Sequence, residues 1–284
     1  MLTEMKMKIE EEINTIEVLP EECIANILLL TNPVDSCKFS IVSKDFCSAS
    51  ESDIVWDHFL PSDLISIISE SQSGSSLLAT SPSKKSLYLT LSDNPVIIDN
   101  GKKSFQLEKQ SGKKIYMLSA RDLSIAWGDT PCYWEWITLP ESRFQEVARL
   151  HMVCWFEIYG KIHSHVLSSN TQYAAFVVYK MIYPHNFNPH GVGSIPVELT
   201  IDKFEDRICT KEVWLDPNYD KELDDELLGL ESPKLRSDGW LEVEIGEFNS
   251  SLQDEVFQIG VVEIRNPHTK CGFILEGIEI RPKN

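Results

Sequence analysis

The sequence predicts an α+β protein of two modules, with short helices near the amino terminus and an antiparallel β-sandwich after them. Two patterns indicate this division. Between residues 18 and 62 apolar residues recur at helical spacing, whereas from residue 114 onward apolar and polar residues alternate in short runs separated by Gly, Pro, Asn and Asp. With 284 residues, 42% of them hydrophobic, the chain can build one large or two modest cores.

Three short helices are predicted within residues 18–62. Pro20 is expected at the first helical position, where a missing N–H costs nothing. Asn32-Pro33 interrupts the first helix, and Asp35 is expected to cap the second. Helices this short cannot bury all of their apolar surface among themselves, so a partner's groove is expected to cover the excess. The alternative is a small helical cap that packs on the rest of the chain.

The order of motifs in this helical segment resembles the F-box family. The shared features are Leu19-Pro20 at the start, Val42-Ser43-Lys44 in the middle and Trp56 near the end. F-boxes dock on a Skp-type adaptor of a cullin ubiquitin ligase, so the resemblance implies a ligase subunit. The residues that it assigns to adaptor binding are Leu19, Pro20, Ile24, Ile27, Leu28, Val42, Phe46 and Trp56.

Residues 63–110 are expected to connect the two modules. A helical continuation at 63–68 gives way to residues 69–86, whose Ser and Gly content favours an exposed loop or linker. At the other end of the helical module, residues 1–17 are rich in Glu and Lys and are expected to form a flexible lead-in.

The sandwich is expected to occupy residues 111–284. Seven of its segments have the β-branched and aromatic content of strands: 115–118, 153–158, 173–182, 197–201, 240–245, 256–264 and 273–280. In the fifth, Glu242 and Glu244 alternate with apolar residues. Glu247 then joins the apolar side unless Gly246 forms a bulge.

Across residues 110–284 the order of motifs resembles the phloem-lectin domain, the Nictaba-like or phloem protein 2-like family of plant carbohydrate-binding proteins. The resemblance is carried by Ala120–Trp127, Tyr133–Trp136, Trp155–Ile162, Arg236–Glu242 and Gly246–Phe248. It implies a jelly-roll-like sandwich that binds N-acetylglucosamine-containing glycans. Joined to an F-box, it implies a receptor that selects glycosylated proteins for ubiquitylation.

The family's sugar-binding positions fall on four residues of this chain. Trp127 and Trp134 stand where its tryptophans would lie, while Glu247 and Asp254 stand at its acidic contacts, although Asp254 is shorter than the expected Glu. The chemistry is suitable, because an indole covers the apolar face of a sugar while carboxylates bind its hydroxyl rim. Three other tryptophans are expected to be packed: Trp155, Trp214 and Trp240.

Composition excludes several other classes of protein. A formal charge of −18 argues against nucleic acid as a partner. No apolar run has the length of a bilayer span and the first residues lack an export signal, so we expect no membrane partner and a place in the cytosol or nucleus. Seven cysteines without CxxC spacing indicate reduced, mostly buried thiols.

Enzyme and metal sites find little support in the sequence. His163-Ser164-His165 places two imidazoles at ligand spacing, but no third ligand is evident, so neither a metal nor another cofactor is expected. We therefore expect a non-enzymatic receptor. Two alternatives remain. One is a receptor that reads protein surfaces after losing sugar binding, as the acidic segment 216–231 suggests, since the soluble lectins often carry a basic stretch there. The other is a β-sandwich glycoside hydrolase that uses paired carboxylates.

Overall fold

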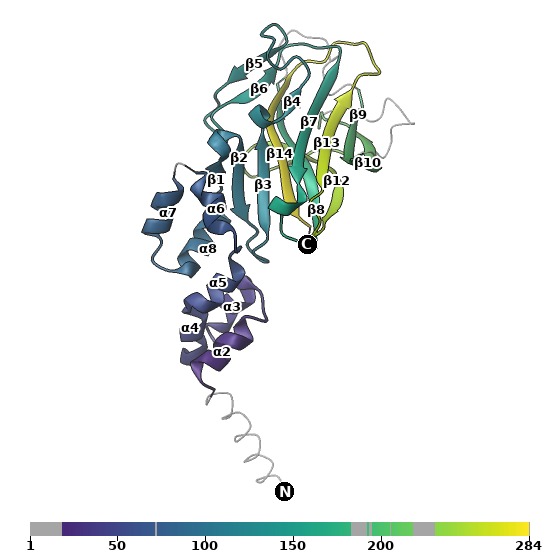
Figure 1. Cartoon of the computed structure of the whole chain (residues 1–284). Helices are drawn as coiled ribbons and strands as arrows, with labels where there is room; N and C mark the ends of the chain where they lie inside the picture. Colours follow the sequence, from purple (N-terminus) through teal and green to yellow (C-terminus); the bar gives the residue numbers. More distant parts are fainter. Residues whose placement is uncertain are drawn as a thin grey trace. The chain divides into compact units, whose positions relative to one another are not determined.

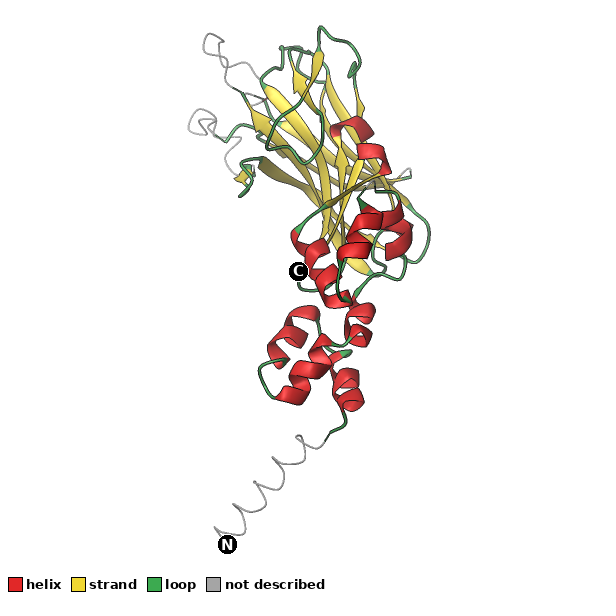
Figure 2. Cartoon of the chain, turned by 90° about the vertical axis from the view of Figure 1, so that its left-hand side faces the viewer, coloured by secondary structure: helices red, strands yellow, loops and turns green. Residues whose placement is uncertain are grey.

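The computed structural model describes residues 19–71, 73–182, 192, 195–204, 206–217 and 231–283. The chain divides into two compact units (Figure 1). The helical unit comprises Met1–Val96 and Gln106–Lys113, and the sandwich unit comprises Ile97–Phe105 and Lys114–Asn284. The α-helices, Glu21 to Asp93, all precede the strands along the chain, and Figure 2 distinguishes the two kinds of element by colour. The predicted α+β class is confirmed. Among the described residues, no helix has the length and apolar character needed to cross a bilayer.

Among the described residues, the helical unit contains seven α-helices: α2 (Glu21–Leu28), α3 (Pro33–Phe39), α4 (Lys44–Glu51), α5 (Asp53–Phe59), α6 (Leu64–Ser69), α7 (Gly74–Thr80) and α8 (Lys84–Asp93). Four of these lie in the segment where three were expected. The additional helix, α4, begins because Ser43 Oγ accepts a hydrogen bond from the N–H of Phe46 at 3.3 Å. Asn32, and not Asp35, caps α3, since its Oδ1 accepts from the N–H of Asp35 at 2.9 Å. Pro20 immediately precedes α2 instead of starting it.

Residues 69–86 do not form the exposed loop that was expected, because they contain α7 and the start of α8. Ser83 Oγ accepts from the N–H of Ser86 at 3.1 Å and so caps α8. Tyr88 and Leu91 are then buried from one side of that helix. Serine here begins a helix and does not mark a linker. The expected lead-in, residues 1–17, and most of the acidic segment 216–231 lie outside the described residues.

The helical unit has a core of its own, centred on Trp56. The indole is fully buried, and its Nε1 donates to the carbonyl of Ser50 at 2.7 Å. Its ring centroid lies 5.7 Å from that of Phe59 and 5.2 Å from that of Tyr88 on α8. The expectation that residues 18–62 need an outside partner to bury their apolar surface is therefore wrong in part, because α8 covers Trp56.

The sandwich unit packs two sheets face to face. One sheet has nine strands in the order β1-β2-β3-β14-β8-β12-β11, with β6 pairing β14 and β5 pairing β6. Its strands are β1 (Val96–Ile98), β2 (Lys103–Leu107), β3 (Lys114–Ser119), β5 (Trp134–Ile137), β6 (Val147–Leu150), β8 (Thr171–Met181), β11 (Lys234–Leu235), β12 (Leu241–Ser250) and β14 (Phe273–Pro282).

The other sheet has five strands in the order β10-β9-β13-β7-β4. Its strands are β4 (Ser124–Ile125), β7 (Phe156–His163), β9 (Val197–Lys203), β10 (Asp206–Val213) and β13 (Val256–Glu263). The strand pairs from β3 onward are antiparallel in both sheets. The predicted antiparallel β-sandwich is therefore confirmed.

Aromatic rings fill the space between the sheets. Phe273 of the nine-stranded sheet lies with its ring centroid 5.3 Å from that of Phe156 in the five-stranded sheet. Further along, the rings of Phe248 and Phe257 meet across the same interface at 4.3 Å. Rings of this size bury much apolar area and fix the spacing of the layers. Trp214 and Trp240 are also fully buried, as predicted.

A bulge in β12 decides which way Glu247 faces. The register between β12 and β8 shifts between Glu244 and Gly246, so Glu247 emerges on the same side as Glu244. Lys283 Nζ pairs with both carboxylates. Glycine is needed at the bulge because a Cβ on Gly246 would lie 2.8 Å from Cys209 Sγ in the opposite sheet. The bulge thus keeps Glu247 out of the core.

Candidate functional site

Trp127, a predicted sugar-binding residue, lies in the turn that follows β4. Its φ is 56°, a left-handed conformation that bulky side chains rarely adopt. The N–H of Thr130 donates to its carbonyl at 2.9 Å and closes the turn. The indole is 49% exposed, and its ring centroid lies 5.7 Å from that of Tyr133, which is 37% exposed. The two rings form an open aromatic surface.

Trp134 does not share this surface. Its side chain is only 2% exposed, its Nε1 donates to the carbonyl of Ala126 at 3.1 Å, and its ring stacks on Phe156 with centroids 6.3 Å apart. An indole buried in this way has no face to offer a sugar ring. The expectation that Trp127 and Trp134 both provide sugar platforms is therefore not met for Trp134, which supports the fold behind Trp127.

The four predicted sugar-binding residues do not converge on one place. Trp127 lies near the start of β7, because the N–H of its neighbour Ala126 donates to the carbonyl of Glu157. Asp254 lies at the other end, where it contacts His163. From Glu157 to His163 is six residues, which span about 20 Å along a strand. Asp254 and Trp127 therefore lie far apart.

Glu247 also lies far from the tryptophans. In the nine-stranded sheet, Glu247 is level with Ala174, which pairs with Arg281 of β14. Trp134 lies on β5, whose neighbour β6 pairs with β14 around Ile274. The seven residues from Ile274 to Arg281 span about 23 Å. The carboxylates and the indoles thus belong to opposite ends of the sandwich.

Both predicted carboxylates already have partners in the protein. Glu247 accepts a hydrogen bond from Gln172 Nε2 at 2.5 Å and forms an ion pair with Lys283. Asp254 accepts from His165 Nδ1 at 2.7 Å, and this hydrogen bond holds the pKa of Asp254 below its usual value.

Trp155, immediately before β7, and Glu157 and Tyr159 on its outer side alternate with buried residues. Trp155 is 44% exposed, so the expectation that it is packed is wrong; its Nε1 donates to Glu157 Oε2 at 2.9 Å. Burial, together with the charge of Glu157, raises the pKa of Tyr159. Its phenol is protonated at neutral pH, as an ordinary tyrosine is, and can donate a hydrogen bond.

A pocket of about 280 Å³ lies beside Tyr159, on the outer face of the five-stranded sheet. Tyr159, Gly260 and Thr200 are neighbours across β7, β13 and β9. A Cβ on Gly260 would lie 2.7 Å from the Tyr159 ring and 2.5 Å from Thr200 Oγ1, so glycine lets the ring and the hydroxyl approach each other. Thr200 is buried, and its hydroxyl has no hydrogen-bond partner among the described residues.

Charged side chains line the same pocket. Glu198 accepts from Arg207 Nη1 at 3.2 Å and also pairs with Arg265. We call Trp155, Glu157, Tyr159, Glu198, Thr200 and Arg207 the β7 face. An aromatic ring beside hydroxyl, carboxylate and guanidinium groups can bind a small polar ligand that has one apolar side.

The sequence contains two signals of the β7 face. Residues 155–159 alternate aromatic, apolar and acidic side chains, which predicts that Trp155, Glu157 and Tyr159 share one side of a strand. Gly260 interrupts an apolar strand, which is typical of a close approach by another group. What the sequence does not contain is the pairing of β13 with β7 and β9, which places Gly260 between Tyr159 and Thr200.

The outer face of the nine-stranded sheet is also rich in charge, but it is closed. Glu279 is almost fully buried and pairs with Arg281 at 2.8 Å, Arg236 at 3.2 Å and Arg143 at 3.4 Å. Glu242 is tied to the same arginines, with Arg281 at 2.7 Å and Arg236 at 2.8 Å. An apolar cluster that includes Trp240 covers the rest of this face. Its carboxylates thus serve in ion pairs.

The predicted adaptor-binding residues separate into two groups. Half of them are buried in the helical unit and build its core: Ile24, Leu28, Phe46 and Trp56. The others are at least partly open to solvent: Leu19, Pro20, Ile27 and Val42. Exposed apolar side chains nearby that were not predicted include Leu30 and Ile41, each 88% exposed. Periodicity could not separate the groups, because both recur on short amphipathic helices.

All seven cysteines lie within the described residues, and all are unpaired. Four are exposed and three are half-buried, so the expectation of mostly buried thiols is wrong. The exposed thiols are those of Cys23, Cys47, Cys132 and Cys154.

Comparison with known proteins agrees with both resemblances found in the sequence. Residues 113–282 match the family Phloem protein 2, and residues 16–58 match the F-box domain. Among curated proteins of Arabidopsis thaliana, the F-box protein At2g02240 is 43% identical over 94% of this chain and 80% of its own length. F-box protein PP2-B10 is 39% identical over 98% of this chain and 97% of its own length.

Two solved structures of low sequence identity match parts of this chain with low TM-scores. A family 35 carbohydrate-binding module from Clostridium thermocellum is 10% identical, covers 58% of this chain and 96% of its own, and has a TM-score of 0.32. A GH26-CBM35 mannanase from Podospora anserina is 13% identical over 60% of this chain and 28% of its own, with a TM-score of 0.34. From its family matches and relatives, the chain belongs to the phloem protein 2 family, as a member that also carries an F-box.

Proposed function

We propose that this protein is the substrate receptor of a cullin-type ubiquitin ligase, and that its sandwich unit binds N-acetylglucosamine-containing glycans on the proteins it selects. The helical unit would dock on a Skp-type adaptor, and the chemistry of ubiquitin transfer would belong to other subunits. The observation that carries the proposal is the union, in one chain, of an F-box with exposed apolar side chains and a phloem protein 2 sandwich with an open polar and aromatic face.

The adaptor half of the proposal rests on apolar side chains that the helical unit leaves in water. Val42 is 60% exposed and the adjacent Ile41 is 88% exposed, in the turn between α3 and α4. Ile27 and Leu30 are exposed on and just after α2. Apolar residues left outside a complete core suit burial in a partner's groove. The four buried residues of the motif would act by holding these side chains in place.

Binding to a purified Skp-type adaptor tests this half. We expect the double change Ile41→Glu and Val42→Glu to weaken binding by more than about tenfold, because two buried charges would replace two apolar contacts. The matched control is Ile65→Glu, a side chain 66% exposed on α6 and outside the F-box match. Equal binding by the double variant and the wild-type chain would contradict the docking surface.

The glycan half rests on the β7 face. Tyr159 can cover the apolar side of a pyranose, while Thr200 brings a buried hydroxyl that lacks a partner among the described residues. Glu198 and Arg207 can bind the hydroxyl rim. The volume of about 280 Å³ is at the small end of ligand pockets and suits a single sugar unit of a longer chain. The aromatic surface formed by Trp127 and Tyr133 is the alternative candidate for the sugar-binding site.

Glycan binding by the full-length protein distinguishes these surfaces. We expect Tyr159→Ala to weaken binding to N-acetylglucosamine oligomers by about five- to thirtyfold, since one stacked ring contributes on the order of 1–2 kcal/mol. The comparison variant is Trp127→Ala, in the aromatic surface that Trp127 forms with Tyr133. Loss of binding only in Trp127→Ala would place the sugar site on that surface and would contradict the proposal that the β7 face binds the sugar.

Absence of glycan binding by the wild-type protein would overturn the lectin function. It would favour a receptor that reads protein surfaces, an alternative consistent with the burial of Trp134 and with the wide separation of the four family positions. In that case Trp127, Tyr133 and Trp155, which are exposed aromatics, become the first residues to test for protein contact.

A further inference from the structure

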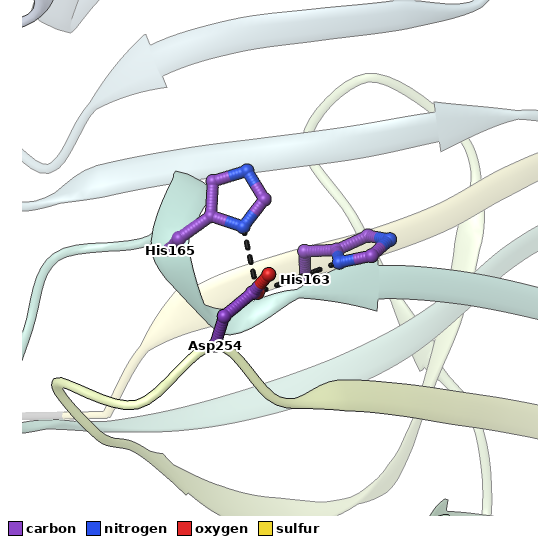
Figure 3. A group of neighbouring side chains, drawn as sticks. All are labelled: His163, His165 and Asp254. Carbon is purple, nitrogen blue, oxygen red and sulfur yellow. Dashed lines mark hydrogen bonds and ion pairs between the residues drawn. The ribbon is translucent and has the colours of Figure 1, made fainter.

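Two histidines and an aspartate gather where β7 ends. His163 is the last residue of β7, and His165 follows in a short 3-10 helix, η3 (Ser164–Val166). Asp254 comes from the segment between β12 and β13, and Figure 3 shows both imidazoles beside its carboxylate. All three side chains are more than half exposed. The fold thus supplies the third ligand that is not evident near the His-x-His motif in the sequence.

The distances suit a single ion after a small adjustment. Asp254 Oδ1 lies 2.7 Å from His165 Nδ1 and 3.5 Å from His163 Nδ1, and the possible ligand atoms of the three residues all lie within 4.8 Å of one another. Ligands held about 2.0–2.1 Å from a tetrahedral zinc ion are about 3.3 Å apart. Because the side chains are exposed, rotation about their side-chain bonds can close the remaining gap.

Ser164 fixes the backbone of this cluster. It is 1% exposed and lies between the two histidines in the sequence. Its Oγ donates to the carbonyl of Gln253 at 2.6 Å and accepts from the N–H of Glu255 at 2.8 Å. Its N–H donates to the carbonyl of Glu255 at 2.8 Å. These bonds hold the residues on both sides of Asp254, so the aspartate is positioned against the two imidazoles before any ion arrives.

We propose that His163, His165 and Asp254 form a binding site for a divalent ion of the zinc class. Two imidazole nitrogens and one carboxylate oxygen match the ligands that zinc, nickel and copper prefer. Calcium and magnesium require more oxygen ligands than this cluster offers. With three protein ligands, the ion keeps a position open to water, and it ties the β12–β13 segment to the end of β7. This site is separate from the β7 face and does not depend on glycan binding.

Zinc titration of the chelator-treated, full-length protein tests the site. We expect one zinc equivalent that is lost in His165→Gln and in Asp254→Asn, with affinity reduced more than about tenfold, because loss of a ligand should exceed the effect of losing an outer-shell partner. Zinc should also raise the melting temperature of the wild-type protein and not of these variants. Ser164→Ala tests positioning and should weaken binding while leaving all three ligands present.

Two controls separate this site from other zinc ligands in the chain. His151→Gln removes a histidine that lies 3.5 Å from Glu135 and should leave the zinc equivalent unchanged. The absorption spectrum of the cobalt-bound protein shows whether the exposed cysteines bind the metal, since a thiolate ligand adds an intense charge-transfer band that imidazole and carboxylate ligands lack. Identical zinc binding by the wild-type and His165→Gln proteins would overturn the proposal. So would a cobalt spectrum that comes only from thiolates.

Discussion

Arg236, beside the nine-stranded sheet, and Arg265, beside the five-stranded sheet, each pair with two glutamates. The side chain of Arg236 is 14% exposed, whereas that of Arg265 is 73% exposed. The same chemistry therefore closes one outer face of the sandwich and leaves the other in contact with water. A buried network whose members are all paired holds a fold together, while an open one can exchange its partners for those of a ligand.

Breaking the closed network should have the largest effect. We expect Arg236→Met to lower the unfolding free energy of the sandwich by about 3 kcal/mol, because it leaves buried carboxylates without one of their partners. Arg265→Met on the open face should cost less than about 1 kcal/mol. Urea unfolding of both variants measures the difference. Equal losses would mean that the two faces do not differ in the way their burial indicates.

Acid should reveal the same network through Glu279. Burial by itself raises the pKa of this carboxyl, but the charges of Arg236 and Arg143 outweigh burial and hold the pKa below its usual value. A folded pKa below the unfolded one stabilises the protein above the unfolded pKa, and this stabilisation is lost as pH falls through the folded value. Glu279→Gln should therefore flatten the decline in stability below about pH 4.5.

The pKa of Glu276, in the same sheet, is shifted in the opposite direction from that of Glu279. Burial raises its pKa despite the hydrogen bond from the N–H of Arg143. Its folded form holds a proton more tightly than its unfolded form, so this residue adds stability as pH falls. Glu276→Gln should thus steepen the acid decline that Glu279→Gln flattens. Unfolding of the two variants between pH 3 and 7, in steps of about half a unit, compares the slopes. The same slope in both would contradict these assignments.

The smallest expected effect compares two buried threonines. Thr171 Oγ1, in the nine-stranded sheet, donates to the carbonyl of Ser169 at 3.0 Å, whereas Thr200 Oγ1 has no partner among the described residues. Thr171→Val should cost about 1 kcal/mol, while Thr200→Val should be neutral or slightly stabilising because it removes a buried hydroxyl that makes no bond. Thermal unfolding measures both changes. A large loss in Thr200→Val would show that its hydroxyl is already satisfied.

Local pattern was enough to predict the class of fold, but not every element. The strand pairs follow the alternation of apolar residues. The side of the strand on which Glu247 lies was predicted to depend on whether Gly246 forms a bulge, and the register shift before Gly246 decides it. The start of α8 was missed because serine favours both loops and helix starts, and it is the burial of Tyr88 against Trp56 that accompanies the helix here.

The candidate sites were harder to predict, since they depend on residues distant in the sequence. Family position could not distinguish the open Trp127 from the buried Trp134, because exposure is set by what packs around each ring, here Phe156 behind Trp134. The pocket beside Tyr159 requires the register of three strands. Asp254 meets His165 across 89 residues, a contact that no local pattern contains.

The chain passes between its two units at Val96–Ile97, again at Phe105–Gln106 and again at Lys113–Lys114. A shortened protein that begins at residue 111 would therefore lack all of β1 and β2, including Phe105, whose buried ring lies with its centroid 5.5 Å from that of Tyr116. It would also expose the hydrogen-bonding edge of β3, to which a second molecule could add a strand. Precipitation of such a fragment would reflect the loss of β2 beside β3 and would carry no information about sugar binding.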